Sequence, residues 1–314
     1  MTTNLTSNTL QTSWRNQAVW SEVANQLKKQ IVLSRTSALL LGILGAILAT
    51  LAAQLATDRP DLARILSIGG AAALVAVTVV ARSFGQKHLE NWIRARSVSE
   101  ALKQEAFFYL TRTRPYAEGD PEATLNSRAN EILTKVKDLT VLAATVNSKQ
   151  NEIPKITSPD DYISQRVSQQ IEHYYYPKAS ALGKRLKMCQ WAAAGLTAIA
   201  ALVSGIAGFF HAEWIGAWVA VATTIAGAIV AHAAAARYEH NVLAYYSTAQ
   251  QLQSLRDQYL DAVNKGVATP PIFDEFVHRC EEVISIENQA WMADWEKLGN
   301  SAQPSNTQPT TQIS

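Results

Sequence analysis

The sequence predicts an all-α membrane protein, in which four transmembrane helices form two hairpins that continue into a cytoplasmic helical bundle. The first observation is that four stretches of the 314-residue chain, 37–57, 62–81, 189–210 and 214–236, carry almost no charge. A hydrocarbon core about 30 Å thick needs roughly 20 apolar helical residues, and each stretch meets that length. The second observation is that the segments between these stretches are charged and amphipathic. We therefore expect membrane-spanning helices that alternate with polar ones.

Short polar turns at 58–61 and 211–213 join the stretches in pairs, so each pair should form a tight antiparallel hairpin. Only Arg59 and Arg64 lie at these turns, whereas more basic residues flank the opposite ends. This bias predicts that both termini and the long central segment face the cytoplasm. The flanking basic residues are Lys28, Lys29, Arg35, Arg82, Lys87, Lys184, Arg185, Lys187 and Arg237.

Four buried helices in a large soluble α-helical protein would give a similar pattern. That alternative requires other helices to cover four helices that are apolar on every side. The amphipathic helices of this chain are too few to do so. We therefore favour the membrane interpretation.

The polar helices follow the same order in both halves of the chain, which indicates two units of one plan, at 14–148 and 159–298. A linker at 149–158 contains Pro154, and the ends at 1–13 and 299–314 are expected to be disordered. Neither 82–100 nor 237–255 contains proline, so we expect the helix after each hairpin to continue straight out of the membrane. The expected polar helices are 14–35, 84–113 and 121–147, then 159–187, 238–265 and 270–298.

Composition and motifs argue against several classes of function. The net charge of +2 and the scattered basic residues do not indicate a nucleic-acid-binding protein. Cys189 lies at the expected start of a membrane helix and Cys280 lies in an expected cytoplasmic helix, so the two do not suggest a disulfide framework. The sequence has no glycine-rich phosphate loop, no His or Cys pair at metal spacing and no serine elbow. We therefore expect no enzyme activity, no cofactor and no metal.

Two stripes of small and polar residues recur every fourth position within predicted spans. The first contains Gly42, Ala46, Thr50 and Gln54, and the second contains Gly216, Ala220, Thr224 and His232. Small residues at this spacing allow helices to approach closely, which favours a packing role. Intramembrane polar groups usually face an interior or a cavity, so pore lining in an oligomer is the alternative.

A family resemblance rests on residues of both halves. In the second half these are the run Tyr162-Ile163-Ser164-Gln165-Arg166-Val167, then Gln170 to Tyr175 before the hairpin, and Tyr245-Tyr246, Glu287 and Trp291 after it. Trp92, Arg96 and Glu100 carry a looser likeness in the first half. With these residues the chain resembles the SLATT proteins, the SMODS- and SLOG-associating two-transmembrane effectors, as a tandem of two units. We regard Trp92, Arg96, Glu100, Arg166, Tyr174, Glu287 and Trp291 as candidate contacts of the cytoplasmic bundle or of a partner.

The resemblance implies a bacterial inner-membrane effector of a conflict or antiphage system. Such an effector would form or gate an oligomeric pore when a cytoplasmic signal arrives. Its expected partners are the lipid bilayer, further copies of the chain, and a nucleotide second messenger or a nucleotide-sensing protein. The alternative function is a nonconducting membrane anchor or scaffold whose cytoplasmic bundle recruits partners.

Overall fold

The computed structural model describes residues 7–83, 85–147, 152–210 and 213–301, with the side chains of the last helix described as far as Ser285. The chain forms two compact units. Unit 1 comprises Met1–Ala24, Glu90–Ile153 and Val277–Ser314, and unit 2 comprises Asn25–Leu89 and Pro154–Phe276. Both units therefore draw on the two halves of the sequence.

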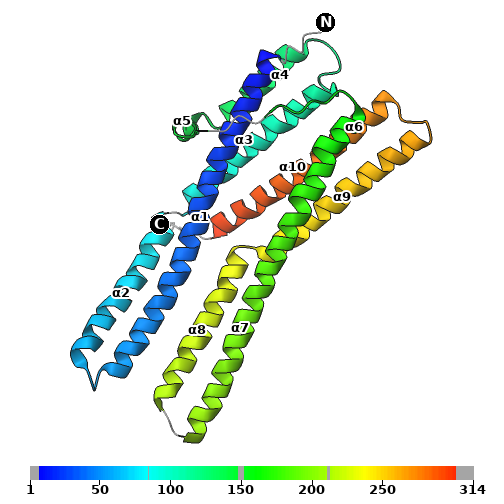
Figure 1. The fold of residues 1–314 in the computed structure, drawn as a ribbon. Helices are drawn as coiled ribbons and strands as arrows, with labels where there is room; N and C mark the ends of the chain where they lie inside the picture. Colours follow the sequence, from blue (N-terminus) through cyan, green and yellow to red (C-terminus); the bar gives the residue numbers. More distant parts are fainter. Residues whose placement is uncertain (1–6, 84, 148–151, 211–212, 302–314) are drawn as a thin grey trace, which may run out of the picture. The chain divides into compact units, whose positions relative to one another are not determined.

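The described residues form helices and contain no strand, which confirms the predicted all-α class (Figure 1). Within the described residues, four helical segments are long and apolar enough to cross a bilayer, so this is a multi-pass membrane protein. The first-half elements are α1 (Asn8–Leu55), α2 (Pro60–Ser83), α3 (Gln86–Thr111), α4 (Pro121–Thr134), η1 (Lys137–Leu139) and α5 (Thr140–Ala144). The second-half elements are α6 (Pro159–Tyr162), η2 (Ile163–Ser168), η3 (Gln170–Tyr175), α7 (Tyr176–Phe210), α8 (Glu213–Ala235), α9 (Tyr238–Asn264) and α10 (Pro270–Ser301).

Two helix starts illustrate how the sequence specifies these elements. Asp120 caps α4, because its Oδ1 accepts hydrogen bonds from the backbone N–H groups of Glu122 and Ala123 at 3.0 and 3.1 Å. Ser158 and Asp161 form a capping box at α6, in which each side chain accepts from the other residue's backbone N–H. A proline follows each cap, where its fixed φ suits the first helical position.

The chain ends differ from the expectation of disorder. α1 begins at Asn8, so the end of the segment 1–13 is helical. The reason is burial, because Leu10 and Ser13 are each only 2% exposed in the core of unit 1. α10 likewise runs to Ser301, past the expected boundary at 299, whereas residues 1–6 and 302–314 lie outside the described part of the chain.

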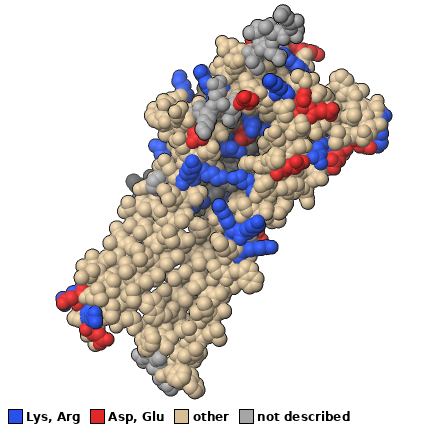
Figure 2. Space-filling view, viewed as in Figure 1, with Lys and Arg blue, Asp and Glu red and all other residues tan. Residues whose placement is uncertain are grey.

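The hairpins belong to unit 2, and each has its own packing seam. In the first, Gly45 and Gly70 let α1 and α2 approach so closely that a Cβ added to Gly70 would lie 3.3 Å from the Gly45 carbonyl oxygen. In the second, α7 packs on α8 through small buried residues such as Ala193 and Ala200. Figure 2 shows little charge on the visible surface of the hairpins except at the α1–α2 turn.

The α8–α9 boundary corrects one prediction. The segment 237–255 does not continue straight out of its span, because α8 ends at Ala235 and Arg237 adopts a left-handed conformation, with φ 52°. The incoming helical path of each hairpin, by contrast, is uninterrupted. These paths are α1 in the first hairpin and the run from α6 through η2 and η3 into α7 in the second.

Candidate functional site at the base of the hairpins

The break at Arg237 leaves backbone carbonyls of α8 without helical partners, and side chains satisfy them. Asn241, which is 5% exposed, donates its side-chain N–H to the Ala236 carbonyl at 3.4 Å. Arg35 of α1 donates from Nη1 to the Ala235 carbonyl at 3.3 Å. A cation at a helix C-terminus also complements the helix dipole. The end of α8 is therefore tied both to its own following helix and to the first hairpin.

His232, a candidate residue of the sequence, lies one turn before this break. Its ring makes an edge contact with Tyr238, with 6.3 Å between the ring centroids. Its backbone carbonyl accepts from the N–H of Ala236 at 2.9 Å, in the last regular bond of α8. The structure thus places His232 in the last turn of α8, next to the break before α9.

The run that enters the second hairpin contains two π turns, η2 and η3. Within η3 the chain closes an i→i+5 bond, because the N–H of Tyr176 donates to the Ile171 carbonyl. Such turns are rare, carry one residue more than an α turn and occur often at functional sites. They lie directly before α7, which continues to Phe210.

The spacing of buried residues explains these π turns. Ile163, Val167, Ile171, Tyr175 and Ala179 recur at every fourth position and are all at most 8% exposed. In a plain α-helix, residues four apart drift by about 40°, so this series would wind about 160° around the helix. Each extra residue in a π turn sets the register back by about 100°. Two π turns therefore keep the whole series on one face.

Aromatic contacts hold the π segment, which is the run from η2 to η3 at residues 163–175, at both ends. Upstream, Tyr162 meets the ring of Phe276 of α10 edge-on, with 6.0 Å between centroids. Downstream, Tyr175 packs against Tyr245 of α9, also at 6.0 Å. Between them Arg166 is only 2% exposed, which is unusual for a charged side chain. The segment is thus fixed on α9 and α10 before the chain enters the apolar part of α7.

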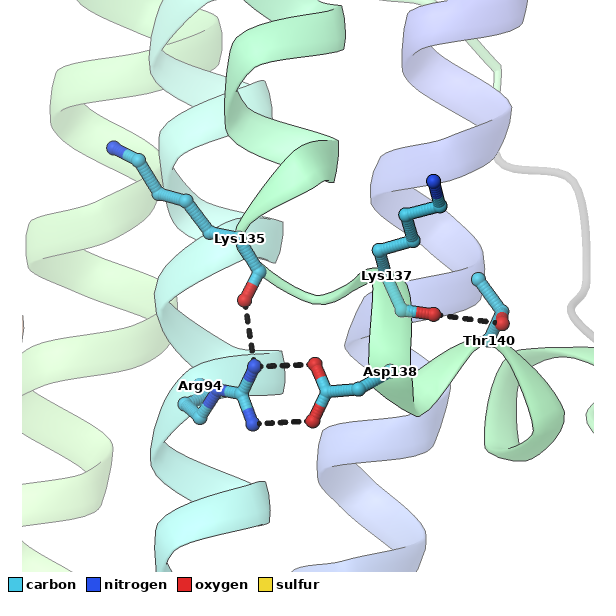
Figure 3. Close-up of polar contacts among 5 residues, drawn as sticks. All are labelled: Arg94, Lys135, Lys137, Asp138 and Thr140. Carbon is cyan, nitrogen blue, oxygen red and sulfur yellow. Dashed lines mark hydrogen bonds and ion pairs between the residues drawn. The ribbon is translucent and has the colours of Figure 1, made fainter.

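Polar clamps fix the first-half helices within unit 1. Arg94 of α3 donates to both carboxylate oxygens of Asp138 and to the Lys135 carbonyl at 2.7 Å (Figure 3). The hydrogen bond from Arg94 holds the pKa of the Asp138 carboxyl below its usual value. This clamp ties η1 to α3.

A second clamp in unit 1 is more deeply buried. Glu105, 8% exposed, accepts from the Tyr116 hydroxyl and from Nη1 of Arg128 at 2.7 Å. Burial, with the hydrogen bond to Glu105, raises the pKa of Tyr116 well above its usual value. Both clamps join elements of the first half.

The intramembrane candidates fall into two environments. Gln54 donates from its side-chain amide to the Trp214 carbonyl at 3.1 Å, which links the two hairpins. Thr50 is partly buried and bonds to the Ala46 carbonyl. Gly42, by contrast, has open space around its Cα, and the close seam of that hairpin uses Gly45 instead. On α8 the exposed members of the second stripe are Gly216, Ala220 and Thr224.

The candidate bundle residues are also dispersed. Trp92 is buried, and Arg96 pairs with Glu100 at 2.9 Å one turn further along α3. Arg166 and Tyr174 belong to the π segment. The side chains of Glu287 and Trp291 lie outside the described residues. Among the described residues, no group of three or more His, Cys, Asp or Glu side chains is placed to hold a metal ion.

Sequence reasoning missed the π turns, the break at Arg237 and the Gly45–Gly70 seam. A signal for the π turns was present, because a four-residue apolar repeat from Ile163 to Ala179 is too long for one face of an α-helix. The bond that Arg35 makes to the end of α8 joins residues that are remote in sequence, so no local pattern indicates it.

Two regions of the chain match known protein families. Residues 162–291 match the SMODS and SLOG-associating 2TM effector domain 1, SLATT_1. Residues 162–291 are a SLATT domain. This SLATT domain contains the π turns, the second hairpin and the break at Arg237. Residues 18–124 match a second family, described as a protein of unknown function (DUF4231), and that match contains the first hairpin. No curated protein and no solved structure matches the chain.

The SLATT domain does not pack by itself. His278 of its helix α10 stacks on Phe108 of α3 within unit 1, with ring centroids 4.5 Å apart. Phe108 belongs to the region that matches the second family. Val277 and Cys280 of α10 are fully buried as well. The two matched regions therefore share one core in unit 1.

Proposed function

We propose that this protein is a membrane effector of a bacterial conflict or antiphage system, which forms or gates an oligomeric pore in the inner membrane. The SLATT domain supports the effector role, and the excess of basic residues at one end of the hairpins supports cytoplasmic termini. The signal is a nucleotide second messenger or a nucleotide-sensing partner protein. In this proposal the protein catalyses no reaction and uses no cofactor.

The observation that carries the proposal is the π segment that leads into α7. Loss of one π turn, with the upstream end still held by Tyr162, would rotate α7 by about 100° and advance it by about 1.5 Å. α8 would not follow α9 rigidly, because the chain breaks at Arg237. A signal that alters the contacts of the π segment would therefore be converted into a rotation within the second hairpin.

The lining of the pore would come from the exposed face of α8. Gly216, Ala220 and Thr224 lie on that face, whereas Gln54 is already occupied by its hydrogen bond to Trp214. Four spans are too few to enclose an aqueous path, so the pore requires several copies of the chain. The nonconducting anchor is the second candidate, and the Gln54 bond favours it, because it places a polar residue in helix packing.

The test is ion flux across liposomes that contain the purified full chain, measured with and without a panel of cyclic and linear oligonucleotides. Flux that depends on one nucleotide, and that falls when Thr224 is replaced by Leu, would support the pore. Ala201→Leu, on the exposed face of α7, serves as the matched control in the same bilayer. A chain that binds a nucleotide, as judged by a thermal shift, and yet never conducts would favour the anchor.

A further inference from the structure

The outer face of α7 carries an exposed basic cluster where the helix enters its apolar part. Lys184, Arg185 and Lys187 are all exposed, and none forms a hydrogen bond or ion pair with the residues that the structure describes. Just beyond them, Met188 and Trp191 are 66% and 77% exposed. Cationic and large apolar side chains therefore lie next to each other, and the cations have no polar partner among the described residues.

All of these side chains except Arg185 share one face of the helix. At about 100° per residue, Lys184, Lys187, Met188 and Trp191 fall within an arc of about 100°. Ala193 and Ala200, which are buried against α8, lie on the opposite side. The cluster therefore points away from the hairpin seam, toward the lipid.

The position of the cluster along α7 matches the thickness of a bilayer. Trp191 and the exposed Phe209 are separated by about 27 Å along the helix, close to the hydrocarbon thickness of about 30 Å. Trp side chains settle at a membrane interface, which places Trp191 at one edge of the hydrocarbon core and Phe209 near the other end of the apolar stretch. Lys187 and Lys184 then lie about 6 and 10 Å beyond Trp191, at the level of lipid phosphates.

We propose that Lys184, Lys187, Met188 and Trp191 form a binding site for the headgroup of an anionic phospholipid, the α7 headgroup site. The two ammonium groups hold the phosphate, and Trp191 with Met188 packs on the glycerol and the upper acyl chain. This apolar continuation selects a lipid over a soluble anion, which would leave Trp191 and Met188 uncovered. The inference goes beyond the proposed function, because it does not depend on conduction.

The experiment measures lipid binding by the detergent-solubilised full chain with native mass spectrometry, using phosphatidylglycerol and, as reference, phosphatidylcholine. Each cation near an anionic surface contributes about fivefold to affinity, so Lys184→Gln with Lys187→Gln should weaken phosphatidylglycerol binding about 25-fold. The matched control is Lys135→Gln with Lys137→Gln, since both side chains point away from the Arg94 clamp in Figure 3. This control should bind as the wild type does.

Three results would overturn the proposal. They are unchanged binding in the α7 double variant, an equal loss in both double variants, and equally tight binding of glycerol 1-phosphate that is insensitive to Trp191→Ala. If the double variant fails to fold, Lys187→Arg with Lys184→Arg keeps both charges, and Trp191→Ala alone should still lower the affinity for the lipid. A failure of ion flux would leave these binding results unaffected, so the two proposals fail separately.

Discussion

Deletion of Gln169 tests whether the π turns set the register of α7. Gln169 is exposed and lies between η2 and η3. With one residue removed, the buried series from Ile163 to Ala179 would drift by only about 60° in a plain α-helix. If the segment loses one π turn and keeps the other, the deletion leaves the net register unchanged, so its buried residues keep their contacts. We expect the free energy of unfolding to change by less than about 1 kcal/mol.

Deletion of Ala181 is the matched control, because this exposed residue lies in the regular part of α7. No π turn is available there to absorb the change, so everything that follows rotates by about 100°. Ala193 and Ala200 would leave the α8 seam, and we expect a cost of about 3 kcal/mol or more. At roughly 2 °C per kcal/mol for a chain of this size, the two melting temperatures should differ by several degrees.

The assay is thermal unfolding of the detergent-solubilised variants, followed by size-exclusion chromatography. Equal losses of melting temperature in the two deletions would refute the register explanation. Ion flux adds a functional measurement, because the Gln169 deletion should fold and yet conduct no ions. A Gln169 deletion that conducts like the wild type would show that the lost π turn has no part in gating.

Three further predictions concern packing, pH and assembly. Gly70→Leu should lower the melting temperature, since a Cβ there already lies 3.3 Å from backbone atoms of Gly45 and Ala49, and overpacking costs about 1–3 kcal/mol, whereas Gly42→Leu should not. The raised pKa of Tyr116 contributes to the stability of the folded state; this contribution is complete below about pH 10 and is lost as the pH rises through the pKa of the folded state. Tyr116→Phe should therefore weaken the fall of the melting temperature with pH between about pH 9 and pH 11. Chains 1–150 and 151–314, expressed together, should co-purify in a pull-down, because α10 shares the core of unit 1, and independent folding of each half would contradict this.

The parts of the fold that could be predicted from the sequence are those set by averages over many residues. A membrane span depends on about 20 apolar residues, so single exceptions such as Arg64 do not hide it. The hairpins follow from the short turns between spans. The candidate site depends instead on single bonds between remote residues, such as Arg35 to Ala235, and these leave no periodic signal.

The packing partner of α10 could not be predicted from the sequence for a different reason. The repeated plan of the two halves favours two units that each keep their own helices, and nothing in the pattern of α10 distinguishes a partner in the first half from one in the second. In the structure the partner is in the first half, because His278 of α10 stacks on Phe108 within unit 1. The matched family regions and the compact units therefore divide the chain differently.

The two structural irregularities of the second hairpin have complementary mechanical effects. α7 is joined to the π segment by unbroken helix, so a rotation imposed there reaches the membrane. α8 is joined to α9 through the left-handed Arg237, whose neighbouring carbonyls are held by side chains. A rotation of α7 would therefore act against a hairpin partner that does not turn with it. The Ala193–Ala200 seam is the contact that such a motion must open, because its small residues hold α7 and α8 close together.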